Sequence, residues 1–137
     1  QFVKHCGDTG EARALAGLSG VELHLCGEGF VRVKSGPVFE AHTRAAETGL
    51  QLAARKLGDP SYGMVVLDEV CGAVACGLLA VSAVRAALEG AAPGKVIVLT
   101  GRDACQELIE LSDTVSRIEC VKHGMDSGWP AQAGVEL

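Results

Sequence analysis

The sequence MVVLDE at residues 64–69 decides the expected fold. Four consecutive apolar residues followed at once by two acids are typical of a strand that is buried on both faces of a parallel sheet. The sequence VIVLTGR at residues 96–102 repeats the arrangement, with Thr-Gly-Arg in place of the acids. Parallel strands end at one edge of their sheet, and open α/β sheets bind ligands outside that edge. We therefore expect Asp68, Glu69 and Arg102 to share a site.

Helical patterns flank both strands. Residues 40–57 carry apolar side chains at spacings of four, three and four, the period of an amphipathic helix, at Ala46, Leu50, Ala53 and Leu57. Shorter helices are expected at residues 10–16, at 82–88 with Ser82 as the cap, and at 104–111 with Ala104, Leu108 and Leu111 inward. Further strands are expected at residues 1–4, 21–25 and 114–121. This alternation predicts an α/β fold with a doubly wound, mostly parallel sheet in one domain, residues 1–137.

The composition excludes several classes of function. The net charge is −5 and no cluster of Lys and Arg is present, which argues against a nucleic-acid surface. The longest apolar stretch, around residues 71–87, is interrupted by Gly72, Gly77, Ser82 and Arg85, so we expect no membrane span. No signal peptide opens the chain, and the six cysteines form no Cys-x-x-Cys pair. A cytoplasmic protein with reduced cysteines is the expectation.

The acid pair Asp68-Glu69 is the first candidate site. Neighbouring residues at the end of a strand point to different sides, so one acid can contact a metal ion while the other orients a water or a neighbouring residue. An apolar strand that closes on two acids is also how nucleotide-phosphate enzymes hold the Mg²⁺ that accompanies their nucleotide. The alternative is that the acids cap the following helix or form surface ion pairs.

Two further segments are candidates. Gly101 allows the backbone to approach a ligand closely, and the guanidinium of Arg102 can bind phosphate oxygens at two points. The alternative for this corner is a turn with Arg102 facing solvent. The C-terminal run at residues 121–136 is rich in glycine and polar groups and carries the single Trp, which suggests an ordered loop beside a site or, alternatively, an ordinary terminus.

Together these segments resemble the ATP:corrinoid adenosyltransferases of the P-loop type. The matching segments follow the family's order along the chain: residues 1–4 (QFVK), 10–11 (GE), 29–30 (GF), 65–69 (VVLDE), 99–102 (LTGR), 107–111 (ELIEL), 113–115 (DTV), 121–123 (VKH) and 131–136 (AQAGVE). The resemblance implies a P-loop NTPase architecture of the RecA-like kind. It also implies that the family's glycine-rich phosphate loop lies upstream of Gln1, so we expect this chain to be incomplete at its N-terminus.

The resemblance implies a specific reaction, transfer of the 5′-deoxyadenosyl group of ATP to the Co(I) of a corrinoid with release of triphosphate, in the biosynthesis or salvage of adenosylcobalamin. No protein nucleophile is implied, so no catalytic residue is assigned. Mg²⁺ would be held by Asp68 and Glu69, and the nucleotide would lie near Gly101 and Arg102. Two further segments would face the corrinoid or order the lid over it, through Gly29, Phe30, Arg32, Lys122 and His123.

The partners implied are small-molecule substrates, a flavoprotein that reduces the cobalt, and a second copy in a homodimer. The sequence departs from the family's usual pattern at two places. Residues 31–34 (VRVK) stand where the family usually carries Thr-Trp-Glu-Thr, and residues 71–73 (CGA) follow the acid pair where a polar or aromatic residue is usual. A non-catalytic relative that binds a corrinoid or nucleotide, and a P-loop NTPase that hydrolyses ATP, are the alternatives.

Overall fold

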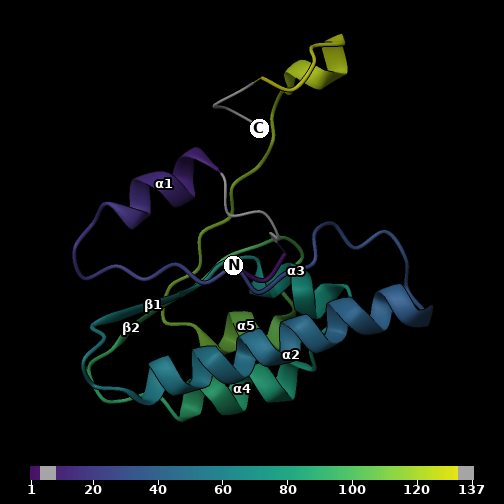
Figure 1. Cartoon of the computed structure of the whole chain (residues 1–137). Helices are drawn as coiled ribbons and strands as arrows, with labels where there is room; N and C mark the ends of the chain where they lie inside the picture. Colours follow the sequence, from purple (N-terminus) through teal and green to yellow (C-terminus); the bar gives the residue numbers. More distant parts are fainter. Residues whose placement is uncertain (4–8, 133–137) are drawn as a thin grey trace.

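The computed structural model describes residues 1–3 and 9–132 (Figure 1). Helices and strands alternate along the chain, which confirms the predicted α/β class. In chain order the elements are α1 (Gly10–Ala16), α2 (Gly36–Gly58), β1 (Met64–Leu67), α3 (Val70–Ala75), α4 (Val81–Glu89), β2 (Val96–Leu99), α5 (Gln106–Leu111) and the 3₁₀ helix η1 (Gly124–Ser127). No helix among them is long and apolar enough to cross a membrane.

The two apolar runs form a parallel pair of strands, as predicted. Met64 lies beside Val96, and Leu67 lies beside Leu99. Because the strands are in register, they end at the same edge of the sheet. The residues that follow them, 68–69 and 100–102, therefore leave the sheet side by side.

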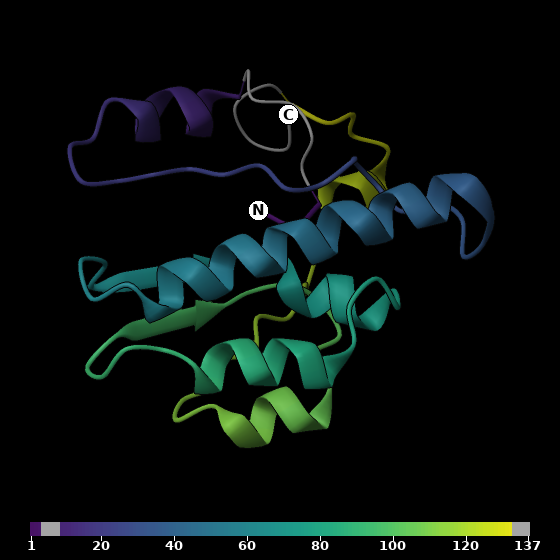
Figure 2. The ribbon, with the colours of Figure 1, turned by 60° about the horizontal axis from the view of Figure 1, so that its bottom comes forward.

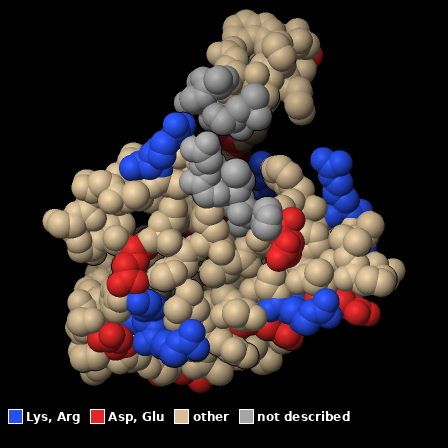
Figure 3. All heavy atoms as spheres, viewed as in Figure 1, with Lys and Arg blue, Asp and Glu red and all other residues tan. Residues whose placement is uncertain are grey.

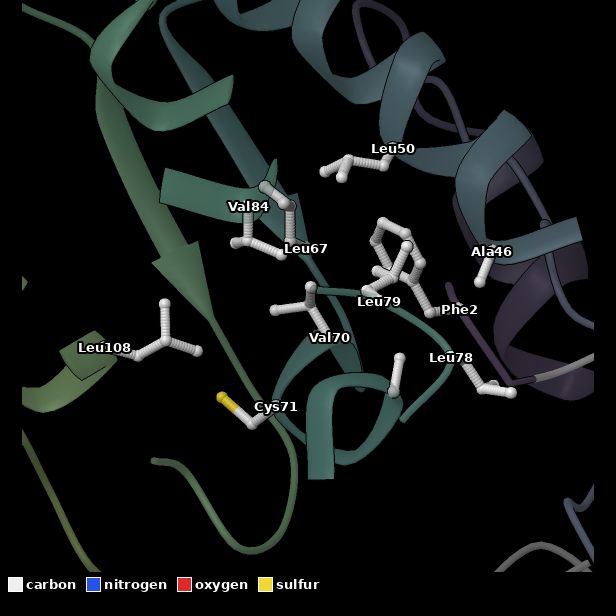
Figure 4. Packing of buried hydrophobic residues seen from close by; sticks show 11 residues of the cluster. Phe2, Ala46, Leu50, Leu67, Val70, Cys71, Leu78, Leu79, Val84 and Leu108 are labelled. Atoms are coloured by element: carbon white, nitrogen blue, oxygen red, sulfur yellow. The ribbon is translucent and has the colours of Figure 1, made fainter. Parts of the chain in front are cut away.

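One face of this sheet is covered by helices. Leu67 packs there with Leu50 of α2 and Val84 of α4 (Figure 4). On the opposite face Met64 remains 57% exposed and Val66 50% exposed. A doubly wound sheet would carry helices on both faces, and within the described residues only the face of Leu67 is covered.

Helix α2 is the longest element and crosses the sheet beside α4 (Figure 2). It begins before the predicted residue 40 because Pro37 fits the first turn, where no backbone N–H is needed. Ala46, Leu50 and Leu57 are buried along its inner stripe, as the spacing predicts. The helix ends at Gly58, where the Asp59 N–H closes on the Arg55 carbonyl at 3.1 Å.

The core lies between α2, α4 and the acid end of β1. Figure 4 shows its side chains converging from the chain start, from α2 and from the segment that joins α3 to α4. Its buried members are Phe2, Ala46, Leu50, Leu67, Val70, Cys71, Ala73, Leu78, Leu79, Val84 and Leu108. Most are small or branched aliphatic residues, as expected for a chain with 4% aromatic residues.

Residues 114–121 do not form the predicted strand. Val115 is largely exposed, and Ile118 and Val121 are 97% and 95% exposed. Residues with high β propensity favour a strand only when a neighbouring strand and a packed face are available. The described part of this segment has neither, and it extends from the body as a single chain (Figure 1).

Residues 21–25 are also not a strand, although they alternate as one. Only isolated bonds join this region to the chain start: the Gln1 terminal ammonium donates to the His24 carbonyl at 2.8 Å, and the Cys26 N–H donates to the Gln1 carbonyl at 2.8 Å. The described part of the predicted strand at residues 1–4 is not a strand either. It is joined to the end of β1 by a hydrogen bond from the Phe2 N–H to the Asp68 carbonyl at 2.9 Å. Lys4 lies outside the described residues.

The structure differs from the predicted helices in three places. Helix α3 was not predicted as an element, because six residues containing a glycine give too short a pattern. Helix α4 begins at Val81 after Ala80, so Ser82 lies inside the helix and is not its cap. In α5 only Leu108 is buried, while Ala104 precedes the helix and is exposed.

Candidate functional site

The carboxyl ends of β1 and β2 meet through one threonine side chain. The Thr100 hydroxyl donates to Asp68 Oδ1 at 2.7 Å. The same hydroxyl oxygen accepts the Glu69 N–H at 3.0 Å. Residues 100–102, which we call the Thr-Gly-Arg corner, are thus in direct contact with the acid pair, as the sequence predicts.

The backbone fixes this corner as firmly as the side chain does. The Thr100 N–H donates to the Leu67 carbonyl at 3.2 Å, and the Cys71 N–H donates to the Thr100 carbonyl at 3.1 Å. At Gly101, where φ is +130°, a Cβ would lie 2.9 Å from the Gly72 nitrogen. Only glycine allows the β2 end to approach the start of α3 so closely.

Glu69 adopts a conformation that is uncommon for a residue with a side chain. Its φ is +62° and its ψ +18°, in the left-handed region, directly before α3. Its side chain makes no capping hydrogen bond to α3. Its Oε2 instead lies close to Gly72. A Cβ added at Gly72 would be only 3.1 Å from this oxygen. Glu69 thus occupies the N-cap position of α3, but its side chain does not cap the helix.

The acid pair is half-buried and has no cationic partner in the described residues. The Asp68 and Glu69 side chains form no ion pair there, so the alternative of surface ion pairs is not seen. The Thr100 hydroxyl is the one hydrogen-bond partner of their four carboxylate oxygens among residues 1–3 and 9–132. Two partly desolvated carboxylates without a counter-charge form a donor set suited to a divalent cation.

Cys71 lies under the acid pair as a buried thiol. Burial raises its pKa above the ordinary value, and the nearby Cys105 and Glu69 add to the shift. The nucleophilic form of cysteine is the thiolate, and a raised pKa keeps that form scarce at neutral pH. Cys71 therefore acts as part of the core.

Arg102 follows Gly101 and is exposed at the same edge. In the part of the chain that the structure describes, no hydrogen bond or ion pair holds its guanidinium. The position leaves this side chain available to an anion that lies beside the acid pair. A cavity of about 820 Å³ also opens from Asp68 along β1, so Asp68 borders open space.

The loop at residues 29–32 is tied to the same edge through the chain start. The Gly29 N–H donates to the Val3 carbonyl at 2.8 Å, and Phe2 beside it bonds to Asp68. Gly29 has a φ of +96°, which turns the chain sharply before Phe30. The Phe30 ring is 81% exposed, and Arg32 is exposed as well.

Lys122 and His123 lie near the C-terminal end of the described residues. They precede η1 in the segment that projects from the body (Figure 1). His123 caps η1, since its Nδ1 accepts the Met125 N–H at 3.1 Å. In residues 1–3 and 9–132 no hydrogen bond or ion pair joins Lys122 or His123 to the acid pair. The end of the same C-terminal run, residues 133–137, lies outside the described residues.

A polar cluster that sequence analysis did not find holds residues 21–25 against α2. Glu22 accepts hydrogen bonds from Lys56 at 2.6 Å and from the Tyr62 hydroxyl. These bonds, with a third contact to His24, lower the pKa of Glu22 to about 2. The Lys56 ammonium also lies 4.4 Å from the centre of the Tyr62 ring. No sequence pattern links residues so far apart in the chain.

Charges are mixed on the surface. On the face shown in Figure 3, Lys and Arg side chains are scattered among Asp and Glu and do not gather in a continuous basic patch. This distribution agrees with the net charge of −5. It gives no electrostatic support for nucleic-acid binding on that face.

Comparison with known proteins identifies relatives over the whole chain. A family model described as "ATP:corrinoid adenosyltransferase BtuR/CobO/CobP" matches residues 1–137. A corrinoid adenosyltransferase of Pseudomonas aeruginosa is 36% identical over 143 residues, which cover 100% of this chain and 67% of the relative. Corrinoid adenosyltransferase CobA of Salmonella typhimurium is 35% identical, with 99% of this chain and 68% of the relative covered. A corrinoid adenosyltransferase of Escherichia coli strain K12 is 36% identical over 136 residues, with coverage of 99% and 68%.

Proposed function

Because the chain belongs to the ATP:corrinoid adenosyltransferase family, we propose that it transfers the 5′-deoxyadenosyl group of ATP to the Co(I) of a corrinoid and releases triphosphate. The observation that carries this proposal is the family match over residues 1–137. The meeting of the acid pair with the Thr-Gly-Arg corner supports it, since both motifs belong to the resemblance and lie at one sheet edge.

The reaction needs no nucleophile from the protein. The electron pair of Co(I) forms the cobalt–carbon bond at the 5′ carbon, and the carbon–oxygen bond breaks with its electrons leaving on the triphosphate. The protein must hold both substrates in line, neutralise the leaving triphosphate and exclude water from the Co(I) state. The buried, protonated Cys71 fits this division of roles, because it offers no competing thiolate at the site.

We assign the metal-binding role to Asp68 and Glu69. Mg²⁺ is usually held by one or two carboxylates together with substrate phosphates. The half-buried acid pair, with three of its four carboxylate oxygens unpartnered in the described residues, fits such an ion. When bound, Mg²⁺ supplies positive charge to the triphosphate as it leaves.

The nucleotide-binding role falls to Gly101 and Arg102. Arg102 is exposed at the edge where the acid pair lies, and its planar guanidinium matches phosphate oxygens at two points. Gly101 holds the corner against the start of α3 and so fixes the direction in which Arg102 leaves the sheet.

The corrinoid side of the site is proposed at Gly29, Phe30 and Arg32. This loop is joined to the acid pair by two consecutive backbone contacts through Val3 and Phe2, and the exposed Phe30 ring offers an apolar surface to a flat macrocycle. Lys122 and His123 are proposed to face the corrinoid or to order the lid over it.

The cellular setting is proposed from chemistry. The described cysteines are all unpaired, which suits the reducing cytoplasm. Co(I) requires an electron donor, and a flavoprotein is the proposed source. A homodimer is proposed as well, because large apolar side chains such as Met64 and Ile118 are exposed on the isolated chain.

The test is product analysis under anaerobic conditions. The purified protein is incubated with ATP, Mg²⁺ and chemically reduced cobalamin, and both the corrinoid and the phosphate products are identified. We expect adenosylcobalamin and free triphosphate in equal amounts. ADP with inorganic phosphate would indicate an ATP hydrolase instead. Binding of the corrinoid without any product would favour a non-catalytic relative.

A further inference from the structure

Thr100 uses all of its polar groups to hold the end of β1. Its backbone N–H and carbonyl are bonded to Leu67 and Cys71, at 3.2 Å and 3.1 Å. Its hydroxyl is bonded to Asp68 and Glu69, at 2.7 Å and 3.0 Å. The residue that directly follows β2 therefore contacts the end of β1, both acids and the start of α3.

The direction of the hydroxyl proton is determined by these contacts. A threonine hydroxyl has one proton to donate and lone pairs that accept. Because the Glu69 N–H donates to the oxygen, the proton is free to point at Asp68 Oδ1, its one acceptor within residues 1–3 and 9–132. This orients one carboxylate oxygen of Asp68 toward β2 and leaves Oδ2 free to face a ligand.

The same hydroxyl supports the backbone of Glu69. That residue is held at a φ of +62°, a region that residues with a Cβ adopt only when their surroundings enforce it. The hydrogen bond from its N–H to Thr100 is one of the enforcing contacts. Loss of the hydroxyl therefore affects both acids: Asp68 through its carboxylate and Glu69 through its backbone.

We propose that Thr100 is a positioning residue that pre-arranges the carboxylates of Asp68 and Glu69 for a divalent cation. This inference rests on the proposed metal-binding role of the acid pair. Partners that orient metal-binding groups typically change metal affinity by about 10- to 100-fold when they are removed. A cross-link that only joined β1 to β2 would change stability and leave metal affinity unaltered.

The variants separate these two roles. Thr100→Val keeps the shape and removes the hydroxyl, whereas Thr100→Ser keeps the hydroxyl. The matched control is Thr43→Val, because Thr43 is also half-buried and its hydroxyl donates at 3.0 Å to the Phe39 carbonyl within α2. Mn²⁺ serves as the probe, and its binding to each purified protein, with and without ATP, is measured by electron paramagnetic resonance. The melting temperature of each variant is recorded in parallel.

We expect Thr100→Val to weaken Mn²⁺ binding by about tenfold, the lower end of the range for such partners. Thr100→Ser should restore the affinity to within roughly twofold, and Thr43→Val should bind as the parent protein does. The Mg²⁺ concentration for half-maximal adenosyl transfer should rise in Thr100→Val, with the KM for the corrinoid unchanged. If Thr100→Val does not fold, Thr100→Ala, which introduces no new steric contact, is judged by the same criteria.

Two failures can be told apart. Unchanged Mn²⁺ affinity in Thr100→Val, alongside weakened binding in Glu69→Gln, would show that Thr100 is only a structural link and would overturn this inference alone. Unchanged Mn²⁺ affinity in both Asp68→Asn and Glu69→Gln would remove the acid pair from the metal site. The proposed metal role would then fail together with the inference that rests on it.

Discussion

Replacing Gly101 with alanine should destabilise the protein and separate the two strand ends. At a φ of +130° an alanine is strained, at a cost of about 1–3 kcal/mol. The added Cβ would also lie 2.9 Å from the Gly72 nitrogen and 3.1 Å from the Cys71 Cβ. Overpacking of this kind costs about 1–3 kcal/mol. We therefore expect Gly101→Ala to lower the free energy of unfolding by about 2–6 kcal/mol.

Urea unfolding measures this loss, and Gly94→Ala is the matched control. Gly94 also has a positive φ, +77°, but a Cβ there would meet nothing within 4 Å. The control should lose only the strain of a left-handed residue, about 1–2 kcal/mol. With a slope of about 2 kcal/mol per molar urea, the midpoint of Gly101→Ala should fall by about 1–3 M. Equal losses in the two variants would refute the close approach of β2 to α3 as the reason for glycine.

The other predictions concern single side chains. Glu69→Gln should raise the Mg²⁺ concentration needed for adenosyl transfer while circular dichroism stays unchanged, and full activity at low Mg²⁺ would remove this acid from the site. Arg102→Lys should raise the KM for ATP about tenfold, because a point charge does not reproduce a planar fork; an unchanged KM would place the nucleotide elsewhere. Glu22 has its pKa lowered from 4.5 to about 2 by Lys56 and Tyr62, so its stabilising effect is present above pH 4.5 and lost as the pH falls toward 2. Thermal melts should show a steeper loss of stability over this pH range in the parent than in Glu22→Gln, and parallel curves would contradict the assignment.

The strand ends could be predicted because their signal is local. Four apolar residues in a row are enough to identify each parallel strand. The expected burial on both faces is wrong within the described residues, because Met64 and Val66 are exposed. The contact between Asp68 and Thr100 is a direct consequence of the parallel register. The buried face of α2 could be predicted for the same reason. The helical spacing of Ala46, Leu50 and Leu57 is visible in the sequence, and all three are buried.

The other features of the fold depend on contacts between residues far apart in the chain, which a local sequence pattern does not predict. Residues 114–121 have the composition of a strand, but a strand forms only beside a partner, and Ile118 and Val121 have none in the described part of the chain. The left-handed backbone of Glu69, directly before α3, is supported by a hydrogen bond to Thr100, 31 residues away in sequence. The Glu22–Lys56 pair likewise joins residues separated by 34 positions.

The most direct test of adenosyl transfer follows the carbon that changes partners. ATP labelled with carbon-13 at the 5′ position is mixed with Co(I) cobalamin and the purified protein in a single anaerobic turnover, and the product is examined by nuclear magnetic resonance. We predict that the label appears in a carbon bonded to cobalt, and that this signal is strongly reduced in Glu69→Gln at limiting Mg²⁺. A label that stays in ATP, ADP or AMP while the protein turns over would contradict the proposed function.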